Sequence, residues 1–481
     1  MALAAKGLTL AAVVGMFLAV GVASPVSAAS TDGPSLLTNF AGPFDPTNGP
    51  PDATLAAAPT RIVELVNSRY AIVNREGLGV TGPIRDLVGA SQSMFLSDPQ
   101  VAWDPESSRF YYSIFENRGA SSPDEGIAWG FSKSSTPNSV ADWCHYFSSF
   151  NYGSQAFPDR PSLGLSADFI MFVAERFGIP FEDFEGVDLA WVKKPHRGKQ
   201  CPQSKTFKSG ITHLTDGGGD QIQWGTAARE VDTNANGWVV AQPAASAANL
   251  LLYKLVKSGS GATVTSPVSV AVPAYSPPPP APQAGLTTAG ALAPTLETKG
   301  YLTQAYAAFD PRLGHTVIWT AHGVAGGAGA AMRWYEINPS AAVVDQLGTI
   351  QDPNLDVFNG TVAPDRVVNG KTSAFGSNMV ATFDTSSATT DVAIGTVSKM
   401  GASPQSPIST AKTSSGPNVD FNCFQPTRSS CRWGDYSGTS PDPGAPAGGP
   451  AGQVWLINQW NVASVDDDTP DWRTFTALAT P

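Results

Sequence analysis

The feature that most constrains the fold is a unit that recurs along the chain. In each copy a polar segment, often with Asp-Pro or Asn-Gly, is followed by a nearly continuous apolar run such as Phe110–Phe115 or Phe169–Ala174. The copies begin near residues 61, 97, 158, 223, 305, 363 and 431, about 60 to 80 residues apart after a shorter first interval. Strands that are apolar on both faces belong to sheets covered on both sides. The recurrence therefore predicts an all-β fold, a β-propeller with seven blades, or alternatively six.

Composition agrees with short strands joined by long loops. Charged residues make up 14% of the chain, against about 25% in typical domains. Glycine (47) and proline (40) are abundant, and no long stretch has helical periodicity. The net charge of −11 argues against nucleic acid or an anionic membrane as a partner, since both attract basic surfaces.

The N-terminus predicts export. Lys6 precedes an apolar core over residues 8–22, and small residues near Ala28 and Ala29 suit a cleavage site, so we assign residues 1–29 to a signal peptide. Residues 30–59 are rich in Pro, Gly and Ala and are expected to form a flexible lead. Residues 60–481 are expected to form one propeller domain with a Pro-rich excursion over its surface at 266–298. The mature protein is expected to be secreted and monomeric.

Four cysteines in an exported chain favour two disulfides, for which three pairings exist. We expect Cys423–Cys431, which closes a short loop, and Cys144–Cys201, which joins neighbouring units. Zinc is the alternative, but C-x-x-C spacing is absent.

Several segments resemble secreted actinobacterial β-propellers of the sialidase-like group. They are the first hairpin around Val66-Asn67, the "DPqvawD" motif from Asp98, and "WGDYSG" from Trp433. The resemblance covers residue 60 to the end and implies a sialidase-like propeller, in a group whose functions are largely uncharacterised. The S-x-D-x-G-x-T-W box of sialidases is absent, and Arg61-Ile62-Val63 lacks the proline of their Arg-Ile-Pro motif.

Four aspartates open different units. Equivalent first-strand positions converge at one end of a propeller channel, so these carboxylates can face one another. Converging carboxylates can bind a hard cation such as calcium, or act as acid and base on a sugar. Alternatively, each aspartate accepts backbone N–H bonds that fix a turn. The four are Asp98, Asp159, Asp365 and Asp435.

Arginines and aromatic residues accompany these aspartates. Arg160, Arg366 and Arg432 can together clamp an anionic group, or each can pair with a neighbouring Asp. Trp224, Trp433 and Tyr436 can stack on a sugar ring at the channel mouth, or pack between blades.

Known catalytic motifs are absent, among them G-x-S-x-G, H-E-x-x-H and the P-loop. The sequence thus favours a secreted propeller that binds an extracellular glycan or protein at the channel mouth, without a cofactor unless calcium binds. The alternative is a glycoside hydrolase of sialidase-like architecture, so enzyme activity is left open.

Overall fold

The computed structural model describes residues 32–481 except 92, 119–124, 154, 180–182, 196–200, 204–206, 287–293, 424–428 and 464–468. The predicted signal peptide lies outside the described residues. Within the described part, no helix is long and apolar enough to cross a membrane.

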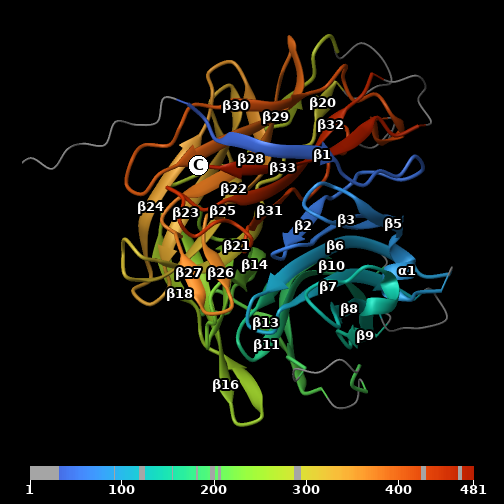
Figure 1. Cartoon of the computed structure of the whole chain (residues 1–481), viewed down its shortest axis with the longest axis vertical. Helices are drawn as coiled ribbons and strands as arrows, with labels where there is room; N and C mark the ends of the chain where they lie inside the picture. Colours follow the sequence, from blue (N-terminus) through green and yellow to red (C-terminus); the bar gives the residue numbers. More distant parts are fainter. Residues whose placement is uncertain are drawn as a thin grey trace, which may run out of the picture.

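The described strands form seven antiparallel units, numbered here in chain order (Figure 1); six have four strands, and in unit 4 two short strands share the fourth position. Unit 1 contains β2 (Thr54–Ala57), β3 (Ile62–Val66), β4 (Arg69–Val73) and β5 (Gly79–Pro83). Unit 2 contains β6 (Phe95–Asp104), β7 (Arg109–Asn117), β8 (Gly126–Ser132) and β9 (Trp143–Ser149). Unit 3 contains β10 (Ala156–Leu165), β11 (Phe169–Gly178), β12 (Phe184–Lys193) and β13 (Ser209–Leu214).

The next two units share one continuous sheet, because β14 and β21 pair in parallel at Ala228–Glu230 and Ala305–Ala307. Unit 4 contains β14 (Ile222–Glu230), β15 (Gly237–Pro243) and β16 (Asn249–Ser258), whose outer edge pairs with both β17 (Gly261–Val264) and β18 (Val268–Ala271). Unit 5 contains β21 (Leu302–Asp310), β22 (His315–Gly326), β23 (Gly329–Asn338) and β24 (Val343–Ile350).

Unit 7 joins the two ends of the chain. Unit 6 contains β25 (Asp356–Pro364), β28 (Met379–Ser387), β29 (Thr390–Lys399) and β30 (Ser409–Thr413). Unit 7 contains β31 (Gly438–Pro441), β32 (Val454–Asn461), β33 (Trp472–Thr480) and β1 (Ser35–Ala41). In Figure 1 the blue β1 lies along the red β33, so an N-terminal strand completes the C-terminal unit.

Short elements connect the units. They are α1 (Ile84–Val88), the 3-10 turns Val140–Asp142 and Phe421–Cys423, and the small pairs β19 (Ala281–Pro282) with β20 (Thr295–Leu296) and β26 (Val367–Asn369) with β27 (Thr372–Ala374).

The first strands of the units surround a common axis. In order, β2, β6, β10, β14, β21, β25 and β31 each contact the next, and β31 contacts β2 again. This closed ring of four-stranded sheets is a β-propeller, as the sequence predicted.

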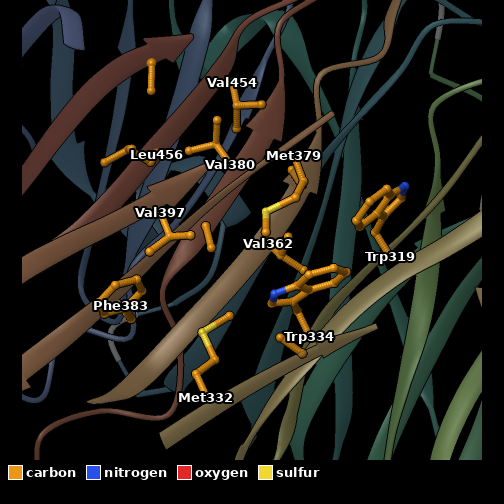
Figure 2. Close-up of a cluster of buried hydrophobic side chains, with 14 of the residues drawn as sticks. Trp319, Met332, Trp334, Val362, Met379, Val380, Phe383, Val397, Val454 and Leu456 are labelled. Carbon is orange, nitrogen blue, oxygen red and sulfur yellow. The ribbon is translucent and has the colours of Figure 1, made fainter. Parts of the chain in front are cut away.

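The core lies between neighbouring units, and this explains the apolar runs. Every residue of β7 except the last is buried, as is the apolar run Phe169–Ala174 of β11. Figure 2 shows one such layer, in which Trp319 and Trp334 of unit 5 pack towards Val362 and Phe383 of unit 6. Both faces of these strands are covered, so apolar and polar residues do not alternate along them.

The expectation of a flexible lead over 30–59 is wrong for the strands β1 and β2. β1 pairs with β33 along the outer edge of unit 7, and all four residues of β2 are buried beside the axis. Small residues suit an inner strand because the first strands crowd together there. The composition Thr-Leu-Ala-Ala therefore reflects tight packing, although such residues rarely indicate a strand.

The Pro-rich excursion runs over neighbouring units, and its described residues are anchored. Arg333 Nη1 donates to the carbonyl of Pro273 at 2.8 Å, and the amide of Ala325 donates to Ser276 O at 2.8 Å. Leu296 forms a parallel bridge with Cys431. The excursion thereby brings the residues that follow it to the loop before β31.

Both predicted disulfides are present. Cys144–Cys201 spans 57 residues and Cys423–Cys431 spans 8.

Candidate functional site

Polar side chains from separate stretches of the chain meet where the first strands begin. They come from the segments before β2, β21 and β31, from the residue after β3, and from β6, β10 and β11. We call them the mouth group: Asp52, Asn67, Asp98, Asp159, Arg160, Glu175, Glu297, Lys299, Tyr301, Arg432, Asp435 and Tyr436.

β-Bulges present two of these residues to the axis. The pairing of β6 with β7 shifts between Ser97 and Gln100, and Asp98 has a φ of 56°. The pairing of β10 with β11 shifts in the same way after Asp159, and Arg160 has a φ of 46°. This left-handed backbone is uncommon outside glycine, and such conformations concentrate at binding and catalytic sites.

Three acidic groups are linked through Asn67. Asn67 Nδ2 donates to Asp52 Oδ2 at 2.5 Å, and the Asp98 amide donates to Asn67 Oδ1 at 2.7 Å. The Asp435 amide donates to Asp52 Oδ1 at 2.5 Å. Units 1, 2 and 7 are therefore joined at the mouth by hydrogen bonds.

Two cations flank the Asp435 carboxylate. Lys299 Nζ lies 3.4 Å from Asp435 Oδ1, and Arg432 Nη2 donates to Asp435 Oδ2 at 3.3 Å. Glu297 lies on the far side, 2.5 Å from Lys299 Nζ and 3.9 Å from Arg432 Nε. Asp435 is thus held by charges from two distant segments.

Arg160 links the carboxylates to an aromatic pair. It is buried, forms an ion pair with Glu175, and lies 3.7 Å over the ring of Tyr301. The Tyr301 ring in turn lies 4.8 Å from that of Trp224. Trp224 therefore contacts the mouth group through Tyr301.

The acidic groups differ in their protonation. Burial acts to raise the pKa of Asp435, but Lys299, Arg432 and Arg160 outweigh it and hold that pKa below its ordinary value. Burial and the neighbouring Asp435 raise the pKa of Asp159, and burial with Asp159 raises the pKa of Asp98. Burial and Asp435 raise the pKa of Asp52 to about 7. One carboxylate with a lowered pKa therefore lies among carboxyls whose pKa values are raised.

Buried polar atoms at the mouth that make no hydrogen bond to the described residues include the hydroxyl of Tyr436, whose residue is 2% exposed, and Nε of Arg160. Buried polar groups are normally paired, so such atoms mark a place where a further group is required. Asp159, Lys299 and Asp435 also line an open hollow of about 540 Å³, which continues along Ser429 and Ser430.

Most of the predicted site residues converge at this mouth, but Asp365 and Arg366 do not. Asp365 follows the far end of β25 and accepts bonds from the amides of Gly376, Asn378 and Gly452. Arg366 pairs with Asp232 at 2.7 Å. The residue of unit 6 that shares the bulge and the φ of 48° is Asn359, which the search for aspartates passed over.

Trp433 is also unavailable to a ligand. It is 1% exposed, packs with Phe358, and donates from Nε1 to Asp384 Oδ2 at 2.7 Å. This tryptophan packs in the core, which was the alternative reading.

Several mouth residues were missed from the sequence. Asp52 lies in the lead, and Lys299 and Tyr301 follow the Pro-rich excursion. The sequence analysis assigned both segments from their composition and sought no site residues there. Glu175 follows an apolar run, and this position suggested the end of a strand and not a site residue. The Pro51-Asp52 step shortly before Thr54 was the available signal for Asp52, since it matches Pro158-Asp159.

The described residues contain one group of three acids whose ligand atoms lie within 4.8 Å, formed by Asp104, Glu106 and Glu230. Lys194 Nζ lies 3.0 Å from Asp104 and 2.5 Å from Glu230, so an ammonium already occupies the place between two of these acids. It lies at the far ends of β6 and β14, away from the mouth. Calcium at the mouth stays a prediction.

No family model and no curated protein matches this chain. Solved structures similar to it include a Trypanosoma rangeli sialidase in complex with the inhibitor DANA, at 9% identity and a TM-score of 0.36, over 79% of this chain and 54% of that one. Phage phi92 endosialidase has 6% identity and a TM-score of 0.38, over 92% and 69%. An ACO/RPE65 chimera has 11% identity and a TM-score of 0.38, over 75% and 74%. The alignment spans about half the length of the trypanosomal sialidase.

Proposed function

We propose that this protein binds a glycan at the mouth of the propeller. The observation that carries the proposal is one open hollow into which charged and aromatic members of the mouth group converge from distant segments. They are Asp159, Glu297, Lys299, Tyr301, Arg432 and Asp435.

The chemistry of the lining favours a sugar. Each sugar hydroxyl both donates and accepts, and the hollow offers carboxylate acceptors at Asp159 and Asp435 beside donors at Lys299 and Arg432. A hollow of about 540 Å³ lies within the usual range for small-molecule sites. A protein partner would instead be expected to use a broader and more apolar patch.

The Lys299→Met variant tests the proposal, because Lys299 lines the hollow. Wild type and variant are screened on a glycan array, and hits are titrated calorimetrically. The variant removes one charged donor from the hollow, so we expect affinity to fall about tenfold, the equivalent of one hydrogen bond.

Lys257→Met is the matched control, since its ammonium pairs with Asp168 at 2.7 Å and neither residue lines the hollow. It should keep full affinity. Equal glycan affinity in Lys299→Met and wild type, or no glycan bound by wild type, would contradict the proposal.

Glycoside hydrolysis is the second candidate, and the opposite pKa shifts favour it. The pKa of Asp435 is lowered and that of the neighbouring Asp159 is raised, and a pair with opposite shifts suits a reaction in which one carboxyl donates a proton to a leaving oxygen and the other acts as base or nucleophile.

A hydrolysis assay on the array hits separates the two candidates. If the site is catalytic, Asp159→Asn and Asp435→Asn each lower the rate by a hundredfold or more, beyond any change in glycan affinity. Binding by wild type without any release of sugar would leave the protein as a lectin-like propeller. We also propose that it acts outside the cell, because the two disulfides suit an oxidising environment.

A further inference from the structure

Two segments of the chain run side by side along the hollow at the mouth. The Cys431 amide donates to Thr295 O at 2.8 Å, and the Glu297 amide donates to Cys431 O at 2.8 Å. These are the bonds of a parallel bridge, so both segments run in the same direction. We call residues 295–301 and 429–435 the paired segments.

Alternate residues of the first paired segment line the hollow. Glu297, Lys299 and Tyr301 belong to the lining, whereas the hydroxyl of Thr298 donates to Pro279 O at 2.8 Å. Side chains alternate in this way along an extended chain. Because such a chain advances about 3.3 Å per residue, the lining from Glu297 to Tyr301 extends over about 13 Å. This length exceeds that of a single sugar ring.

Contacts between the paired segments recur at successive positions along the hollow. They are Thr295 Oγ1 to Ser430 Oγ at 3.1 Å, Glu297 Oε2 to Arg432 Nε at 3.9 Å, and Lys299 Nζ to Asp435 Oδ1 at 3.4 Å. Each position therefore combines a donor with an acceptor. Since every sugar hydroxyl both donates and accepts, successive rings of an oligosaccharide would find partners of both kinds.

The charges of the lining favour a neutral glycan. Lys299 Nζ lies 2.5 Å from Glu297 and 3.4 Å from Asp435, and Arg432 donates to Asp435 at 3.3 Å. Both cations of the described lining are thus paired with carboxylates. Asp159 is a third acid against these two bases, and the charges only cancel if it is protonated. An acidic sugar would therefore meet no excess of positive charge.

From the length of the lining, its repeated donors and acceptors and its charge balance, we propose that the mouth binds a neutral oligosaccharide of more than one sugar unit. The sugar chain lies along the paired segments. One end lies beside Asp159 and Tyr301, and the other lies beside Ser429 and Ser430. This inference rests on the proposed function and specifies the class of glycan.

An array that carries glycans of increasing length tests the proposal. It holds neutral gluco-, manno- and galacto-oligosaccharides and acidic oligogalacturonides, each from the monosaccharide to the pentasaccharide, and hits are titrated calorimetrically. We expect wild type to retain neutral chains in preference to acidic chains of the same length. Affinity should rise about tenfold from monosaccharide to trisaccharide, the equivalent of one further hydrogen bond.

Ser429→Trp obstructs one end of the hollow. Ser429 is exposed and lines the hollow at the start of the second paired segment. The variant should lose about tenfold more affinity for the trisaccharide than for the monosaccharide, because only the longer chain reaches this end. Ser340→Trp is the control, since Ser340 is exposed in a turn of unit 5 outside the lining, and it should match wild type.

Three results would overturn the inference while glycan binding itself stands. They are equal affinity for monosaccharide and trisaccharide, stronger retention of oligogalacturonides than of neutral chains, and equal losses for both lengths in Ser429→Trp. If wild type retains no glycan of any length, the proposed function fails, and the inference fails with it.

Discussion

At the scale of single residues, this propeller buries ionisable groups whose partners come from other units. Glu64 of β3 is fully buried. Its carboxyl accepts a hydrogen bond from the hydroxyl of Thr476 on β33. Burial raises the pKa of Glu64 from 4.5 to about 7. The native state therefore retains a proton that the unfolded chain releases.

This difference predicts a pH dependence of stability. Between about pH 4.5 and pH 7 the folded state binds the proton and the unfolded state does not, so the free energy of unfolding falls as pH rises. Glu64→Gln has no proton to lose, and its amide retains the acceptor for Thr476. We expect the variant to exceed wild type by about 3 kcal/mol at pH 8 and to equal it below pH 4.5.

Denaturant unfolding at several pH values measures the effect. Glu76→Gln, at an exposed position, should track wild type throughout. A constant difference between Glu64→Gln and wild type from pH 4 to pH 8 would show that Glu64 does not hold its proton.

At the scale of elements, the two disulfides have different tasks. Cys144–Cys201 ties β9 of unit 2 to the segment before β13 of unit 3. Cys423–Cys431 closes the loop that immediately precedes Arg432, and Leu296 bridges to Cys431. The second disulfide therefore fixes mouth residues from both the excursion and the loop.

We predict that removal of either disulfide lowers stability, and that only removal of Cys423–Cys431 also weakens glycan binding. Replacing both cysteines of the 57-residue span by serine should cost about 4 kcal/mol of stability and leave glycan affinity unchanged. The same change in the 8-residue span should cost about 2 kcal/mol and weaken glycan binding. Denaturant unfolding and calorimetric titration measure both. Equal affinity in the two variants would contradict a positioning role for Cys423–Cys431.

The elements also show what sequence can predict. Runs such as Phe110–Phe115 revealed the second strands because both faces of a strand between two units are covered. β1 and β2 were not predicted as strands, because an edge strand and a crowded inner strand both have weak hydrophobic patterns. Asp98, Asp159 and Asp435 were found at the mouth because they share a position in the unit. Lys299 was not, because only closure of the ring brings it to its partner.

At the scale of the whole molecule, the ring closes through β1. Its residues from Ser35 to Ala41 pair with β33, so the ends of the chain are joined within one sheet. Opening this sheet exposes the edge of β33 and weakens the contact between units 7 and 1.

Truncation tests this closure. A chain that begins at Gly42 loses β1 and should melt at least several degrees below a chain that begins at Ser35, which retains it. Both are measured by calorimetry under the same conditions. Equal melting temperatures would show that β1 adds nothing to the closed ring.

Asp435→Asn tests most directly whether the mouth group forms the ligand site. The ionised Asp435 holds Lys299 and Arg432 in place, so its neutral isostere should disrupt the site and leave the ring intact. The measurement is a glycan array with a parallel glycosidase screen, with Asp345→Asn, whose carboxylate pairs with His315 on unit 5, as the control. The account predicts that wild type and the control retain the same glycan and that Asp435→Asn changes its retention or its cleavage. Identical retention and cleavage in all three proteins would contradict it.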